Sequence, residues 1–199
     1  RTTTTEELKT YGVGSRTAIP YESKAKLMLS MHLNSSDSKK NNGVEIYTAY
    51  DDDITFAKKI ADNIVKETSS DYSINPLNRV SNGVYTRIYE QENIKSTYNQ
   101  AIREGWTPYN IKPNTTYYYF IRETGGILTK AFADGRNTNY EANPYYNANY
   151  GVEAYLIESG YISNNDNLKI ILNEKDNYVK ALKNSILEYV KEELWKKYV

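Results

Sequence analysis

Cysteine is absent from this chain of 199 residues, and histidine occurs only once, as His32. The lack of cysteine excludes a disulfide framework and a thiolate metal site, although it leaves an extracellular location open. Every apolar run falls short of the roughly 18 residues that a membrane span requires. The 25 basic and 25 acidic residues cancel and form no long basic patch. Neither nucleic acid nor an anionic membrane is therefore an expected partner.

Tyrosine is abundant, with 21 residues, and two explanations of this bias stay open. An AT-rich genome would enrich tyrosine, asparagine and lysine without any functional cause. Alternatively, exposed tyrosine and asparagine line a carbohydrate or peptide groove, because aromatic rings offer a flat apolar face and a polar hydroxyl.

Strand and helix patterns alternate along the chain, which is long enough for one domain. The predicted strands cover residues 27–33, 43–48, 115–123 and 152–158, and the predicted helices cover 54–67 and 173–197. A weak pattern over 69–113 predicts an insertion between core elements. We expect one α/β domain over residues 1–199, with a mostly parallel central sheet flanked by helices.

Two side chains at predicted strand ends are candidate reactive groups. His32 lies near the end of the first strand, and Glu158 lies at the end of the strand "VEAYLIE". Active sites of parallel α/β sheets gather at the carboxyl ends of strands. The residues alone also allow a structural histidine and a glutamate in a salt bridge or helix cap, and no spacing pairs the two.

Two motifs resemble those of the zinc-dependent N-acetylmuramoyl-L-alanine amidases, which hydrolyse peptidoglycan. The family pattern S-[IL]-H-x-N…G-x-E is matched by Ser30, His32, Asn34, Gly43 and Glu45. The family pattern E-x-G-[FY]-[IL]-[ST]-N is matched by Glu158, Gly160, Tyr161, Ile162, Ser163 and Asn164. The motifs occur in the family's order, at similar spacing.

The resemblance implies cleavage of the amide between N-acetylmuramic acid and the L-alanine of the stem peptide. In such an enzyme Zn²⁺ activates water and a glutamate serves as general base and then general acid. By resemblance His32 is a zinc ligand and Glu158 is the catalytic carboxylate, while Asn34 and Arg122 are guesses for support or substrate contact. The implied partner is peptidoglycan, and the implied location is extracellular, at the cell wall.

The family's other two zinc ligands, a histidine and a glutamate, precede the segment that Arg1-Thr2 resembles. We therefore expect an N-terminally incomplete catalytic domain, inactive alone and completed by an associated N-terminal fragment. Two alternatives remain: a non-catalytic wall-binding module derived from the same fold, or a different α/β binding domain.

Overall fold

A computed structural model provides the structure, which describes residues 19–20, 23–50, 52–88, 90, 116–118, 120–121 and 152–198. The chain divides into two compact units. One comprises Arg1–Leu29 with Arg87–Ala154, and the other comprises Ser30–Thr86 with Tyr155–Val199. The second unit contains all of the described helices longer than one turn, and most of the described strand residues.

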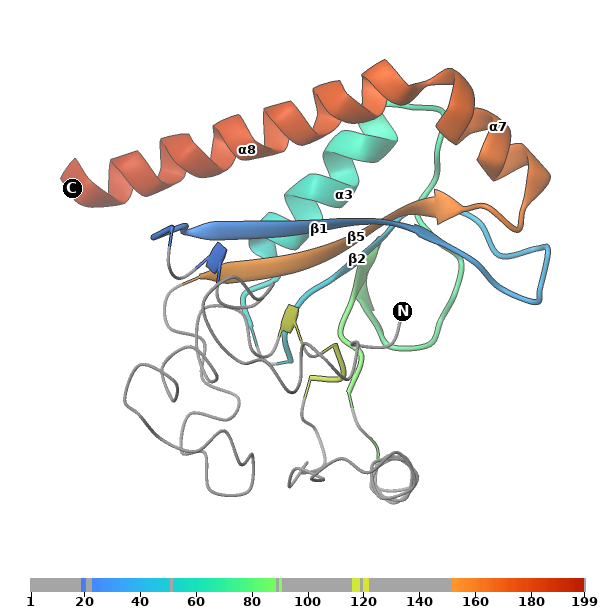
Figure 1. The fold of residues 1–199 in the computed structure, drawn as a ribbon, viewed down its shortest axis with the longest axis horizontal. Coiled ribbons are helices and arrows are strands. Elements are labelled where there is room, and N and C mark those ends of the chain that lie inside the picture. The colour runs from blue at the N-terminus through green and yellow to red at the C-terminus, as the bar shows by residue number, and fades with distance from the viewer. Residues whose placement is uncertain are drawn as a thin grey trace. The chain divides into compact units, whose positions relative to one another are not determined.

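A five-stranded sheet has the order β1-β5-β2-β4-β3 (Figure 1). The strands are β1 (Leu27–Asn34), β2 (Glu45–Tyr47), β3 (Arg79–Ser81), β4 (Val84–Tyr85) and β5 (Glu153–Tyr161). Strand β2 runs parallel to β4 and antiparallel to β5, and β3 runs antiparallel to β4. Backbone hydrogen bonds from Glu153 N to Lys26 O and from Ile162 N to Asn34 O, both 2.9 Å, make β1 and β5 parallel.

The predicted α/β class is confirmed, but the sheet is mixed where a mostly parallel one was expected. The reason lies in the connection from β1 to β2, which is only residues 35–44. A parallel pair needs a crossover of about a dozen residues or more. The chain therefore reverses after β1, and β5 later enters between these two strands.

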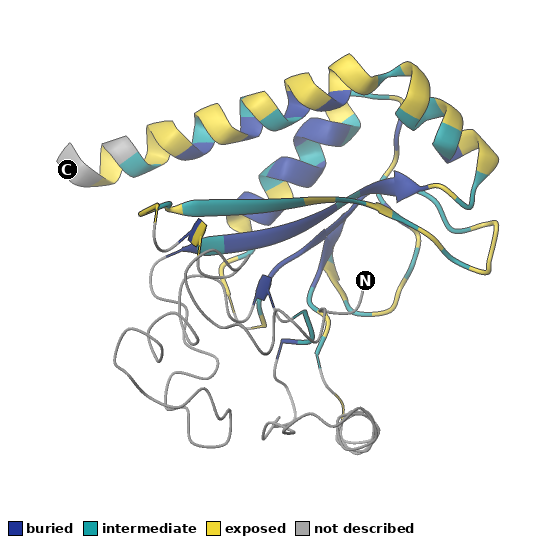
Figure 2. Ribbon diagram, viewed as in Figure 1, coloured by how far each residue is buried: buried dark blue, intermediate teal, exposed yellow. Residues whose placement is uncertain are grey.

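Helix α3 (Thr55–Glu67) forms where it was predicted and buries Phe56, Ile60 and Ile64. Their spacing of four residues places them on one helix face. Helices α3 and α8 (Lys175–Tyr198) pack against each other, and α3 also contacts β2 and β4. Figure 2 shows the buried residues concentrated where α3 meets β2 and β5. The core of this unit therefore lies between the helices and one face of the sheet.

The helix predicted over 173–197 is confirmed as α8, which covers Lys175–Tyr198, and Glu174 separates it from α7 (Asn165–Asn173), a helix that the sequence pattern did not predict. The sequence pattern of this helix predicts an apolar stripe of Val179, Leu182, Ile186, Val190 and Leu194, but in the structure Val179, Ile186 and Val190 of α8 are exposed. The buried face consists of Tyr178, Ala181, Ser185 and Tyr189. Both stripes have helical spacing, so periodicity could not choose between them. The small Ala181 and Ser185 side chains allow α3 to approach closely.

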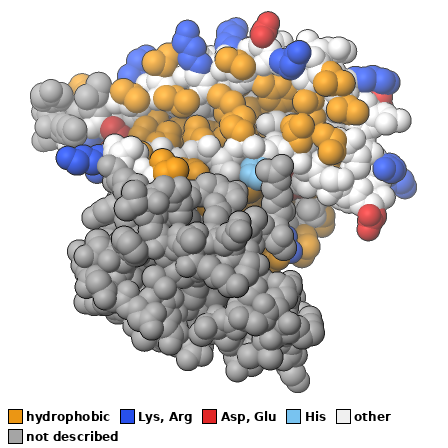
Figure 3. Space-filling model, viewed as in Figure 1, with side chains coloured by type: hydrophobic (Ala, Val, Ile, Leu, Met, Phe, Trp, Pro, Cys, Tyr) orange, Lys and Arg blue, Asp and Glu red, His pale blue; other side chains and the backbone are white. Residues whose placement is uncertain are grey.

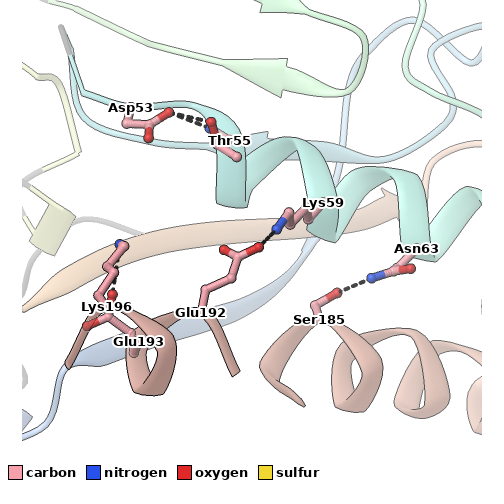
Figure 4. Close-up of polar contacts among 8 residues, drawn as sticks. All are labelled: Asp53, Thr55, Lys59, Asn63, Ser185, Glu192, Glu193 and Lys196. Atoms are coloured by element: carbon pink, nitrogen blue, oxygen red, sulfur yellow. Dashed lines mark hydrogen bonds and ion pairs between the residues drawn. The ribbon is translucent and has the colours of Figure 1, made fainter. Parts of the chain in front are cut away.

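A buried hydrogen bond links the two helices (Figure 4). Asn63 Nδ2 of α3 donates to Ser185 Oγ of α8 at 3.0 Å, and Ser185 Oγ donates to Ala181 O at 3.0 Å. Lys59 also forms an ion pair with Glu192 at the surface of this helix pair. This polar contact fixes the register of α8 on α3, because the two buried groups satisfy each other only in one alignment.

We predict that Ser185→Ala lowers the free energy of unfolding by about 1–3 kcal/mol, because it leaves the Asn63 amide buried without its acceptor. The matched control is Val179→Ser on the exposed face of the same helix, with an expected change within about 0.5 kcal/mol. Urea denaturation measures both. A larger loss for Val179→Ser would show that the buried face of α8 has been misassigned.

The strand predicted over 115–123 is not formed by its described residues. Thr116 makes an isolated bridge with Ile88, whereas Phe120 and Ile121 are helical. The predicted insertion over 69–113 begins with residues that supply β3 and β4, and its part from 91 to 113 lies outside the described residues. Among the described helices, none has the length and apolar character needed to span a membrane.

Candidate active site

His32 lies on β1, an edge strand of the described sheet, and is half-buried. A hydrogen bond of 3.0 Å joins its Nε2 to Ser30 Oγ. Side chains two residues apart on a strand point to the same face. Ser30, His32 and Asn34 therefore form a polar row along one face of β1, which explains the alternation of the S-x-H-x-N motif.

Asn34, the last residue of this row, uses both of its amide atoms. Its Nδ2 donates to Glu45 Oε2 at 3.0 Å, and its Oδ1 accepts from Ser35 N at 2.8 Å. The second contact fixes which way the amide faces, since only the oxygen can accept from a backbone N–H. Asn34 is thus held in place by β2 and by the turn after β1.

Glu45 begins β2 and is fully buried, with five donors around its carboxylate. The donors are Asn34 Nδ2, Tyr47 OH at 2.8 Å, Ser73 Oγ at 2.7 Å, Asn75 Nδ2 at 3.4 Å and Tyr161 OH at 2.6 Å. They come from three strands and from the segment after α3. Glu45 therefore connects the ends of β1 and β5 to β2.

The glycines of both motifs permit close backbone approaches around Asn167 of α7. Asn167 Oδ1 accepts from Gly43 N at 3.1 Å and from Tyr161 N at 2.6 Å. Gly43 has φ +87°, and a Cβ there would lie 2.6 Å from the Asp71 carbonyl oxygen. A Cβ on Gly160 would lie 2.7 Å from Asn167 Oδ1. Glycine is needed at both positions, and the two motifs meet at one asparagine.

Glu158 pairs with Glu45 across the antiparallel β5–β2 ladder. The strand continues to Tyr161, so Glu158 lies inside β5 and not at its end. Its Oε2 is buried and has no hydrogen-bond partner among the described residues. Burial, and then the negative charge of Glu45, raise the pKa of Glu158 to about 7. A carboxyl that exchanges its proton near neutral pH is suited to acid–base catalysis.

Glu158, Glu45 and Asn34 lie on the sheet face that the helices do not cover. Directly paired residues of an antiparallel ladder point to the same side, which places Glu158 with Glu45 and, through its hydrogen bond, with Asn34. Tyr155 stacks on Phe56 of α3, with ring centroids 5.3 Å apart, and by alternation it points away from Glu158. The candidate site is therefore on the face of the sheet opposite α3.

The structure thus places three predicted site residues, His32, Asn34 and Glu158, on one face of two neighbouring strands. The fourth, Arg122, lies outside the described residues. Sequence reasoning included Glu45 in a motif but gave it no role, and it missed Ser73 and Asn75 altogether. These two come from the segment taken for an insertion, where no periodic pattern marked them.

The described residues do not form a zinc site on their own. They contain no group of three histidine, cysteine, aspartate or glutamate side chains that could hold a metal ion. A catalytic zinc requires about three protein ligands, and His32 is the single histidine of the chain. What the arrangement provides by itself is one imidazole and one carboxyl that titrates near neutral pH.

A family model and several solved structures resemble this chain. A family model described as N-acetylmuramoyl-L-alanine amidase matches residues 1–106, which include His32 and Asn34 and end before Glu158. No curated relative matches the chain.

Among solved structures, the catalytic domain of CwlV, an N-acetylmuramoyl-L-alanine amidase from Bacillus (Paenibacillus) polymyxa var. colistinus, is 18% identical with a TM-score of 0.50. The match covers 92% of this chain and 65% of that one. The CwlD amidase of Clostridioides difficile, solved with the GerS lipoprotein, is 17% identical with a TM-score of 0.44, and the match covers 89% of this chain and 60% of that one. The amidase AmiC2 of Nostoc punctiforme is 16% identical with a TM-score of 0.46, over 88% of this chain and 64% of that one.

These chains are thus longer than the part that this chain matches. At such identities the first likeness concerns the fold alone, in agreement with the α/β sheet and its helices. The family model carries the assignment, since it matches more than half of the sequence. The chain belongs to the N-acetylmuramoyl-L-alanine amidase family.

Proposed function

We propose that this chain carries the acid–base part of a zinc-dependent amidase that cleaves the bond between N-acetylmuramic acid and L-alanine in peptidoglycan. The observation that supports this is the carboxyl of half-buried Glu158: its Oε2 atom is buried without a hydrogen-bond partner among the described residues, and the side chain lies on the same face as His32. The membership in the amidase family names the substrate class.

Glu158 would work in both halves of the hydrolysis. As a carboxylate it takes a proton from the attacking water, and as a carboxylic acid it then returns that proton to the amine of L-alanine as the C–N bond breaks. Each turnover leaves the side chain as it began. A pKa of about 7 serves both steps, because neither protonation state is strongly disfavoured at neutral pH.

Zinc dependence requires ligands beyond those described. We propose His32 as one ligand, with at least two more supplied by polypeptide that packs beside β1. Strand β1 is an edge of the described sheet, and it exposes Met31 and Leu33 by 50% and 49%. Hydrophobic side chains also gather on the face that Figure 3 shows. An additional strand along β1 would cover apolar surface and bring side chains next to His32.

The same proposal gives the substrate contacts and the location. Asn34 supports the site through Glu45, and Arg122 is proposed to bind a carboxylate of the stem peptide bidentately. Action on peptidoglycan implies secretion to the cell wall, where such an enzyme would be an autolysin. One observation favours a second candidate, a non-catalytic wall-binding module: the described residues lack a three-ligand metal group.

Removal and return of zinc tests the proposal. The full-length protein, stripped with a chelator, is expected to lose all release of stem peptides from purified peptidoglycan and to regain it with one equivalent of Zn²⁺. The 199-residue chain alone is expected to bind zinc weakly, because it contains one histidine. A chelated protein that stays fully active would refute zinc dependence, and a full-length protein that binds peptidoglycan without hydrolysing it would establish the binding module.

A further inference from the structure

Glu45 carries a role that neither the motif nor the family assignment gives it. We propose that Glu45 is a positioning residue of this site: a buried carboxylate that fixes Asn34 and Tyr161 at the ends of β1 and β5 and places a negative charge opposite Glu158. The inference rests on the proposed function, because Glu158 is there the acid–base group, but its test does not measure turnover.

The hydrogen bonds around Glu45 support the carboxylate form. Asn34 and Asn75 present amide N–H groups, which can only donate. Ser73 and Tyr161 donate to the Oε1 atom at 2.7 and 2.6 Å, the short lengths expected for bonds to a charged acceptor. A carboxylate accepts such bonds at both oxygens, whereas a protonated carboxyl could direct its own hydrogen only at a hydroxyl, because the amide N–H groups cannot accept.

Within the part of the chain that the structure describes, no cation is paired with this carboxylate. None of the ion pairs among the described residues involves Glu45, although its side chain has no exposed surface. Isolated buried charges are costly, and several neutral donors that converge on one carboxylate offset part of that cost. The charge of this buried carboxylate acts on its neighbours, and one of them is Glu158, its partner in the β5–β2 ladder.

The carboxyls of Glu45 and Glu158 differ in the number of hydrogen-bond donors around them. Glu45 has five donors, while Glu158 has a buried oxygen that no other described residue contacts by a hydrogen bond. When two like groups interact, the one with fewer donors keeps its proton to higher pH. The charge of Glu45 accordingly contributes to the raised pKa of Glu158.

Other groups that titrate near this face are His32 on β1 and the phenols of Tyr161, Tyr85 and Tyr47. Burial raises the pKa of Tyr161 and of Tyr85 above the ordinary value, so both stay neutral through the range in which Glu158 titrates. His32 is the imidazole on this face of the sheet. Its ring shifts therefore have to be followed in the same experiment.

The test is an NMR titration of the Glu158 side-chain carboxyl carbon in the metal-free 199-residue chain, with the His32 ring nitrogens recorded in parallel. In Glu45→Gln, which removes the charge at nearly constant size, the midpoint of Glu158 is expected to fall by about one pH unit. The matched control is Tyr161→Phe, which removes one donor from the same carboxylate and keeps the charge. It is expected to lower stability and leave the midpoint within about 0.3 pH unit, well below the shift that removing a charge gives.

An unchanged Glu158 midpoint in folded Glu45→Gln overturns the proposal, as does an equal shift in Tyr161→Phe. If Glu45→Gln does not fold, the double variant Glu45→Gln with Asn34→Asp tests whether residue 45 positions residue 34. In this variant the 3.0 Å contact again joins one amide and one carboxylate, but the amide is now at residue 45 and the carboxylate at residue 34. Aspartate at 34 can also still accept from Ser35 N. Recovery of a cooperative unfolding transition supports the positioning of residue 34 by residue 45, and a double variant that stays unfolded refutes it.

Discussion

Replacing Glu158 with glutamine is expected to lower turnover of the zinc-loaded, full-length protein by roughly 10²–10⁴-fold, the usual contribution of general acid–base catalysis. Glutamine keeps the shape of the side chain but can neither take the proton of water nor return it to the leaving amine. Zinc content and folding are expected to survive, because Glu158 is assigned no ligand role. Release of new alanine amino termini from purified cell wall measures the rate.

The matched control is Glu153→Gln, on the same strand but on the opposite sheet face by alternation, with an expected rate within about twofold of the unaltered protein. Normal turnover in Glu158→Gln would make Glu158 structural. Loss of zinc in that variant would make it a ligand, which contradicts the assignment made here.

The pH dependence of stability gives Glu158→Gln an independent check. The pKa of Glu158 rises from an ordinary 4.5 to about 7 on folding, so the folded chain binds the extra proton between these values. The stabilisation is complete below pH 4.5 and is lost as the pH rises through 7. In the metal-free chain, Glu158→Gln is therefore expected to unfold at a higher urea concentration than the unaltered chain at pH 8, with a smaller difference at pH 4.

Replacing His32 with alanine is expected to abolish zinc retention in the full-length protein while most of the fold survives. His32 is half-buried on an edge strand, so its side chain contributes little to the core. A site reduced to two protein ligands no longer holds a catalytic zinc against dialysis. Metal analysis after dialysis measures the loss, and circular dichroism checks the fold.

Leu33→Ala is the control for this substitution, since Leu33 is the next residue along and points to the other face of β1. It is expected to keep stoichiometric zinc. Unchanged metal content in His32→Ala would remove the histidine from the ligand set and leave the proposed zinc site without support from this chain.

Local sequence pattern predicted those elements whose side chains repeat at a regular spacing. Helix α3 was placed within a residue of its ends, because Phe56, Ile60 and Ile64 recur every four residues. Helix α8 carries two rows of residues with that spacing. The row with more aliphatic side chains was predicted to be buried, but the other row is the buried one. Ser185 on the buried stripe gains its partner only from Asn63 of another helix, which no local window contains.

The site was predictable only where a residue type is itself chemically informative. The single histidine, His32, and a glutamate after an apolar run, Glu158, are recognisable in the sequence as candidate reactive groups, and the structure places both on one face of the sheet. The pKa of Glu158 is raised first by burial in the folded sheet and then by the charge of Glu45, which lies on a strand paired over a long sequence separation. Strand β4, only two residues long, was missed because so short a run has no period to detect.

Identification of the bond that is cut decides whether the proposed amidase activity is correct. Purified peptidoglycan is digested with the zinc-loaded full-length protein, and the soluble and insoluble products are analysed by mass spectrometry. We expect free stem peptides that begin with an unblocked L-alanine, together with glycan strands of unchanged length whose N-acetylmuramic acid carries a free lactyl carboxylate. Shortened glycan strands with peptides still attached, or cleavage within the stem peptide, would contradict the proposed activity.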